Sequence, residues 1–158
     1  MAELTRQTLD WIPSAPLALT GTGASAASPD AVFAVLADHE RWPEWFPNVR
    51  SVEVTGAPSG VGATRRVKLP GASVDEMFIA WDPGERWSFT GTAARPRFVT
   101  SIVEDCRLTA TVDGGTIISY TMYLAPAPLF RPFLKLAAPQ IQKSLQTAVG
   151  RLGERAAR

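Results

Sequence analysis

The feature that most limits the fold of this chain is a series of six extended segments with no helical pattern between them. Gly- and Pro-containing turns such as PGA, DPGE and DGG separate several of these segments, and such turns are typical of β-hairpins. Strands that follow one another in this way pair side by side, so the series predicts an antiparallel meander. The segments are rich in β-branched and aromatic residues and occupy residues 49–56, 63–69, 73–81, 86–93, 99–112 and 116–124.

The residues before this series combine one further strand with two short helical segments. Residues 17–26 have an extended pattern, and Ser28 and Pro29 then suit the N-cap and the first position of a helix. Pro43 must end or kink that helix. The stretch HERWPEWFP, residues 39–47, is therefore predicted to form a second short helical piece.

The C-terminal segment has the periodicity of a long amphipathic helix. Pro139 predicts a kink in this helix, and its apolar stripe, Phe133 included, is expected to pack in the core. The stripe recurs at intervals of three and four and consists of Phe130, Phe133, Leu134, Ala137, Ile141, Leu145, Ala148 and Leu152.

Length and composition limit the organisation and the class of protein. The 158 residues fit one domain, predicted over residues 17–158, after an N-terminal extended arm at residues 1–16. Pro13 and Pro16 argue against a regular element in the arm, and Trp11 and Ile12 are expected to contact the domain.

The inventory of charged and metal-binding residues excludes several functions. A formal charge of +1 argues against a nucleic-acid partner, and one histidine with one cysteine cannot form a zinc or iron site, so neither a metal nor a cofactor is expected. A lone cysteine, no secretory signal and no long apolar run predict a cytoplasmic protein without an integral membrane segment. Residues 128–158 contain six cations and one acid and so carry a net charge of +5, whereas residues 1–127 carry a net charge of −4.

Two stretches of the sequence resemble those of a known family. SPDAVFAVLADHERWPEWFPNVRSVEV, followed by GVGATRRV, resembles the START-like (SRPBCC) superfamily in its polyketide cyclase/dehydrase-type branch, and the order of elements agrees over about residues 17–155. The resemblance implies an α+β helix-grip fold. In that fold a seven-stranded curved antiparallel sheet wraps around a long C-terminal helix, two short helices follow the first strand, and a ligand cavity lies between sheet and helix.

Under this fold the stretch HERWPEWFP covers one end of the cavity. Trp45 and Phe46 are then expected to line the cavity, and Trp42 to anchor the segment. His39 lies between two acidic residues and is predicted to be a surface or helix-end residue.

Strand parity predicts charged side chains inside the sheet. Arg65, Glu104 and Tyr120 each share a face with apolar neighbours, whereas residues 73–81 allow either Glu76 or the opposite face to point inward. These charges either close the interior as an ion pair or orient a ligand. The predicted cavity residues are Trp45, Phe46, Arg65, Glu76, Phe78, Trp87, Phe89, Glu104, Tyr120, Met122, Phe133 and Ile141.

Three functions follow as hypotheses. The first is binding or carriage of an apolar or aromatic small molecule, such as a lipid, polyketide or isoprenoid, by a monomer or homodimer. The second is a cyclase/aromatase acting by aldol condensation and dehydration, with Arg65, Glu76 and Tyr120 as catalytic candidates, helped by Glu104, Ser88 or Ser101. The third is a coenzyme Q-binding-like lipid chaperone whose basic C-terminal helix makes peripheral membrane contact, although a solvated helix face is an alternative explanation of that charge.

Overall fold

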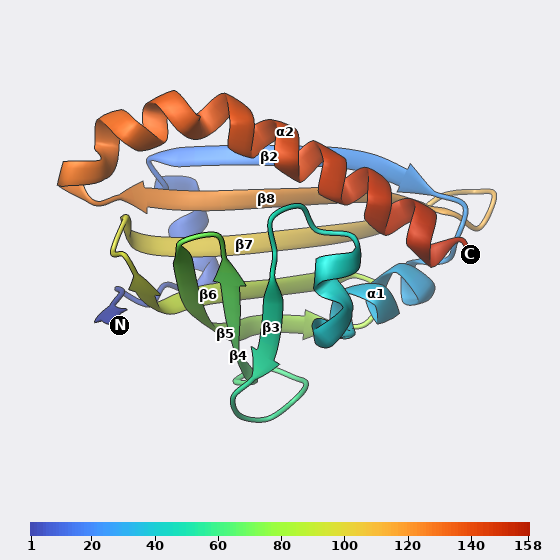
Figure 1. Cartoon of the computed structure of the whole chain (residues 1–158). Coiled ribbons are helices and arrows are strands. Elements are labelled where there is room, and N and C mark those ends of the chain that lie inside the picture. The colour runs from blue at the N-terminus through green and yellow to red at the C-terminus, as the bar shows by residue number, and fades with distance from the viewer.

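The computed structural model describes residues 1–158 and contains one curved antiparallel sheet with a long helix lying across it (Figure 1). The strand order is β2-β8-β7-β6-β5-β4-β3, so the first long strand pairs with the last and the rest form a meander. This arrangement confirms the predicted helix-grip fold. The long strands are β2 (Leu17–Ser25), β3 (Ser51–Val54), β4 (Thr64–Leu69), β5 (Ala72–Asp82), β6 (Arg86–Arg95), β7 (Val99–Ala110) and β8 (Thr116–Pro126).

Two short helices and one long helix complete the domain. α1 (Pro29–Ala37) begins as predicted, because the Ala31 N–H donates to the Ser28 hydroxyl at 3.3 Å. The 3-10 helix η2 (His39–Glu44) follows it directly, and a 3-10 turn, η3 (Pro128–Phe130), leads into α2 (Arg131–Ala156). α2 continues through Pro139, and no helix of the protein is long and apolar enough to span a bilayer.

α2 is fixed against β2, which is an edge strand of the sheet (Figure 1). The Thr20 N–H donates to the side-chain oxygen of Gln142 at 3.0 Å, and the Thr22 N–H donates to that of Gln146 at 3.1 Å. The two glutamine amides also donate back to the carbonyl oxygens of the same threonines. One turn of helix therefore satisfies backbone groups that an edge strand would otherwise leave unpaired.

The N-terminal segment is part of the sheet, which differs from the predicted arm without regular structure. β6 and β7 pair only as far as Thr90 and Val103, and beyond that point β1 (Ala2–Glu3) pairs with β6. The next residues bridge the gap, since the Leu4 N–H donates to Thr92 and the Thr5 N–H to Thr100. Pro13 lies further along the chain, inside the 3-10 helix η1 that residues Leu9–Ser14 form. Trp11 and Ile12 are only half-buried, and Leu4 is the buried residue of the segment.

The core consists of two separate clusters. The larger, of 21 buried residues, lies beneath α1, η2 and the C-terminal half of α2. The smaller, of seven residues, joins Leu4 and Leu134 to the opposite ends of the strands. Met122 and Ile141 contact both clusters and are only partly buried, so the interior between the clusters is not filled.

The close approach of α2 to β2 depends on glycine and can be tested by substitution. A Cβ atom at Gly21 would lie 2.7 Å from the Leu145 carbonyl oxygen, so Gly21→Ala must push the helix away. We expect it to lower the free energy of unfolding by roughly 1–3 kcal/mol in urea titrations. Gly150 is the matched control, because a Cβ there meets nothing within 4 Å. Gly150→Ala should raise the stability by about 0.5–1 kcal/mol, and equal effects of the two substitutions would contradict this account.

Candidate functional site

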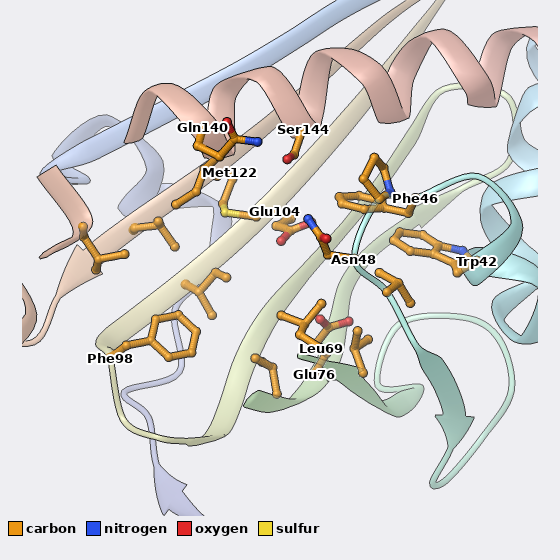
Figure 2. A pocket seen from close by; sticks show the side chains of 18 of the residues that line it. Trp42, Phe46, Asn48, Leu69, Glu76, Phe98, Glu104, Met122, Gln140 and Ser144 are labelled. Atoms are coloured by element: carbon orange, nitrogen blue, oxygen red, sulfur yellow. The ribbon is translucent and has the colours of Figure 1, made fainter. Parts of the chain in front are cut away.

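A cavity of about 250 Å³ lies between the sheet and α2, where the two core clusters fail to meet (Figure 2). Nineteen residues line the cavity, of which 12 are hydrophobic. The hydrophobic ones are Trp42, Phe46, Val49, Val67, Leu69, Val74, Phe98, Ile102, Met122, Leu124, Leu134 and Ile141. The polar ones are Asn48, Arg65, Glu76, Glu104, Gln140 and Ser144, and Pro47 completes the set.

Arg65 is the central polar group of this wall and is fully buried, with 0% of its surface exposed. It is directly opposite Glu76 in the pairing of β4 with β5, and its Nε donates to Glu76 Oε2 at 2.6 Å. The guanidinium carbon also lies 4.1 Å from the ring centre of Trp42 and 4.9 Å from that of Trp87. A carboxylate and two aromatic faces thus replace the water that this cation loses on folding.

His39 completes the contacts of Arg65. It lies at a helix end, as the first residue of η2, but it is buried and not at the surface. It is only 5% exposed, its Nδ1 lies 3.1 Å from Arg65 Nη1, and its Nε2 lies 3.3 Å from the Pro58 carbonyl oxygen. Nδ1 therefore accepts from Arg65 while Nε2 donates to Pro58. Burial, and then the positive charge of Arg65, lower the pKa of His39 to about 4, which keeps the ring neutral. Its acidic neighbours in sequence, Asp38 and Glu40, are exposed, whereas the imidazole between them is buried.

Glu104 is the second buried carboxyl of the cavity, and no cation contacts it. The Tyr120 hydroxyl donates a hydrogen bond to Glu104 Oε2 between the neighbouring strands β7 and β8. Burial, and then the nearby charge of Glu76, raise the pKa of Glu104 to about 8. Burial raises the pKa of Glu76 too, although Arg65 opposes that shift. Arg65 neutralises the charge of Glu76, the carboxylate that it contacts, and leaves Glu104 without a paired cation. Glu104 therefore holds its proton at neutral pH and can donate a hydrogen bond into the cavity.

The structure brings half of the predicted cavity residues together around this space. Phe46, Arg65, Glu76, Glu104, Met122 and Ile141 line the cavity. The side chains of Trp45, Phe78, Trp87, Phe89 and Tyr120 are buried in the larger core cluster and do not line it. Phe133, predicted to be core, is 62% exposed and lies outside the lining.

The roles predicted for Trp42 in η2 and for Trp45, which directly follows η2, are exchanged in the structure. Trp42, expected to be only an anchor, both lines the cavity and donates from its Nε1 to the Leu36 carbonyl oxygen at 2.9 Å. Its ring stacks on Phe46 at 5.4 Å with an interplanar angle of 10°. Trp45 instead packs behind Trp42, with the ring centres 4.6 Å apart.

Several lining residues were missed although the sequence carried a signal for them. Val67, Ile102 and Leu124 have the same strand parity as Arg65, Glu104 and Met122, so alternation alone would have selected them. For residues 73–81, where parity allows either face, the structure selects the face of Val74, Glu76 and Phe78, which are buried. Ser88 and Ser101 do not join the site, because their hydroxyls donate to the carbonyl oxygens of Glu104 and Thr5.

The fold and the cavity define a START-like helix-grip protein. The chain belongs to the family described as polyketide cyclase / dehydrase and lipid transport, whose family model matches residues 17–157. Uncharacterized proteins of Mycobacterium tuberculosis and Mycobacterium bovis are 35% identical to it over 147 residues, which is 87% of this chain and 87% of each relative.

Solved structures of other organisms share the fold. An aromatase/cyclase of a Streptomyces species superposes with a TM-score of 0.73 at 18% identity, over 90% of this chain and 96% of that one. A START superfamily protein of Mycobacterium smegmatis gives 0.70 at 15% identity, over 87% and 98%. At these identities the similarity concerns the fold. The structure contains no group of three or more His, Cys, Asp or Glu side chains arranged to hold a metal ion.

The raised pKa of Glu104 predicts a pH dependence of stability. The unfolded chain releases this proton near pH 4.5 and the folded protein near pH 8, so rising pH favours the unfolded state across that window. The stabilisation is complete below pH 4.5 and is lost as the pH rises through about 8. We expect Glu104→Gln, measured by urea unfolding, to lose less stability than the wild type between pH 6.5 and 8.

His39 provides the control of opposite sign. Its pKa is lowered from 6.5 to about 4, so its contribution is present above pH 6.5 and is lost as the pH falls towards 4. His39→Asn should therefore flatten the acid side of the stability profile and leave the alkaline side unchanged. A Glu104→Gln profile parallel to that of the wild type would show that Glu104 is ionised in the folded protein.

Proposed function

We propose that this protein binds and carries a small, mainly apolar molecule in the cavity between the sheet and α2. The observation that carries the proposal is the cavity itself: an unfilled space inside the domain, walled by 12 hydrophobic residues and by a few buried ionisable groups. Ligand sites in proteins commonly combine an apolar wall with a small number of placed polar groups in this way.

The volume of the cavity limits the ligand. Sites for drug-sized molecules span roughly 300–1,000 Å³, and an apolar cavity of about 150 Å³ holds benzene. A cavity of about 250 Å³ lies between these sizes. It suits one or two fused rings or a short isoprenoid, whereas a long acyl chain would extend out through the mouth.

The polar groups favour a ligand with an oxygen at one end. Glu104 offers a protonated carboxyl at the inner wall, and the Nη2 group of Arg65 has no hydrogen-bond partner in the protein. Both groups donate, so they match a carbonyl or phenolic oxygen. Gln140 and Ser144 on α2, with Asn48 opposite, supply further polar contacts in the lining (Figure 2).

Filling the cavity should weaken binding without unfolding the protein. Met122→Trp adds an indole to the space, and Ile117→Trp is the control, because Ile117 is on the same strand but is exposed on its outer face. With 1-naphthol as the probe, we expect native mass spectrometry and calorimetry to detect one bound molecule per chain for the wild type and Ile117→Trp. Met122→Trp should bind at least about tenfold more weakly. If wild type and Met122→Trp bind the probe equally, the cavity is not the site.

A second candidate function is catalysis of an aldol condensation followed by dehydration of a poly-β-keto chain. The observation that favours it is a neutral carboxylic acid, Glu104, buried in an apolar cavity beside Tyr120. In the aldol step an enol carbon attacks a carbonyl carbon, Glu104 gives its proton to the carbonyl oxygen, and the proton released by the enol hydroxyl restores the acid. In the dehydration step Glu104 protonates the new hydroxyl, which leaves as water, and the carboxylate then takes the proton that the adjacent carbon loses as the double bond forms. Arg65 stabilises negative charge that develops on an enolate.

Replacement of the acid separates carriage from catalysis. Glu104→Gln keeps the shape and the hydrogen-bonding capacity of the wall but cannot transfer a proton, and Tyr120→Phe removes only the Tyr120 hydroxyl. If the protein is a cyclase, turnover of a synthetic poly-β-keto thioester should fall about 10²–10⁴-fold in Glu104→Gln, while probe binding changes little. Absence of turnover in the wild type leaves carriage as the function, whereas turnover that this substitution does not change excludes Glu104 as the acid.

A further inference from the structure

The first two turns of α2 and the segment before them present large apolar side chains to solvent. Leu129 is 86% exposed, Phe133 62% and Leu136 83%. Phe133 and Leu136 are three residues apart on one face of α2, and Gln140, four residues further along, lines the cavity. Gln140 is itself exposed, so the apolar side chains lead along α2 to the mouth of the cavity. Figure 2 shows Gln140 and Ser144 on this helix.

The two chain segments that carry these side chains contain cations and no acid. Residues 125–153 contain four cations, among them Arg131 and Lys135, and no Asp or Glu. The β6–β7 loop lies next to this segment, because the Ala127 N–H donates to the Phe98 carbonyl oxygen at 3.0 Å. Phe98 lines the cavity, its neighbour Arg97 is exposed, and residues 86–103 also lack acids.

Positive charge on the sheet side belongs to the other face of the sheet. Lys68 is next to the lining residue Leu69 in β4, so its side chain points to the opposite face. A shallow hollow at the β4–β5 hairpin brings Lys68 together with Arg50 and Arg95. The solvent-exposed cations beside the cavity lining are therefore those of α2 and of the β6–β7 loop.

We propose that Leu129, Phe133 and Leu136, together with Arg97, Arg131 and Lys135, form a mouth patch that docks on an anionic lipid bilayer. The apolar side chains enter the interface between headgroups and acyl chains, and the cations contact the anionic headgroups. A second copy of the chain fits less well, because a two-fold dimer would press the patch against itself, with the cations of one copy facing those of the other. Docking would let an apolar ligand pass between bilayer and cavity without entering water, so the inference rests on the proposed function.

Vesicle co-sedimentation tests the patch directly. We expect the wild type to bind vesicles of phosphatidylcholine mixed with phosphatidylglycerol at low salt and to release at high salt, because exposed charges are screened within about 10 Å at 0.1 M. Binding to phosphatidylcholine alone should be much weaker. The double substitution Phe133→Asp/Leu136→Asp should weaken binding to the anionic vesicles about tenfold or more.

Two matched controls separate the patch from general charge and hydrophobicity. Val112→Asp/Ile117→Asp makes the same chemical change at exposed residues near the opposite end of β8, and it should bind as the wild type does. Arg131→Gln/Lys135→Gln should weaken binding more than Arg151→Gln/Arg158→Gln, although both remove two charges. All four pairs are exposed, so unfolding in urea should verify that each variant remains folded.

Three outcomes would overturn the inference. The wild type does not sediment with anionic vesicles at low salt, or the patch and control variants lose vesicle binding equally. In the third outcome the wild type forms a dimer that Phe133→Asp/Leu136→Asp disrupts, and it does not bind vesicles. These outcomes are distinguishable from failure of the proposed function. A wild type that takes up 1-naphthol but ignores vesicles rejects docking alone. A wild type that binds vesicles but no probe keeps the docking surface and rejects the cavity as a ligand site.

Discussion

The interior of this protein depends on the burial of one guanidinium group. Taking an arginine out of water costs several kcal/mol unless it is paired and hydrogen-bonded. Arg65 meets that requirement with a cross-strand carboxylate, an imidazole nitrogen and aromatic faces. These partners come from β5, β6 and η2, so the same contacts that solvate the cation also hold η2 against the sheet.

The position of the cavity follows from this arrangement. Around Arg65 the aromatic side chains pack edge to face and fill the interior, as Phe78 and Trp87 do with ring centres 4.9 Å apart. Towards the N-terminal end of α2 the side chains are aliphatic and belong to a separate, smaller cluster. The open space lies between a rigid polar-aromatic end and an aliphatic end. A ligand placed there would meet hydrogen-bond donors on one side and hydrocarbon on the other.

Much of the fold could be predicted from the sequence, because turns and alternation are local properties. Parity placed Arg65, Glu104 and Tyr120 inside the sheet, since a residue cannot change face without a shift in register. Parity does not report the position along a strand, so Phe89, which shares a face with Trp87, was assigned to the cavity although it lies in the filled core. The burial of His39 depends on Arg65, 26 residues away in the chain, and no local pattern contains it.

The apolar stripe predicted for the C-terminal helix fails to identify the buried side chains only at the beginning of α2. Adjacent residues in a helix point about 100° apart, so when Leu134 takes the buried place, Phe133 cannot share it. A stripe drawn on a spacing of three and four accepts both residues. The distinction depends on how the helix is rotated about its axis, which the glutamine contacts with β2 determine.

The pairing of residues 2–7 with β6 and β7 has a consequence for the order in which the protein folds. Gln7 bonds to Thr90 and Thr5 to Thr100, across 83 residues of chain in the first case. During synthesis on the ribosome residues 2–7 therefore emerge long before the ends of β6 and β7 with which they pair. Contacts between such distant residues close large loops and form slowly. Until they form, the splayed ends of β6 and β7 keep unpaired backbone groups, and this end of the sheet is the region where a newly made chain is most open to pairing with its neighbours.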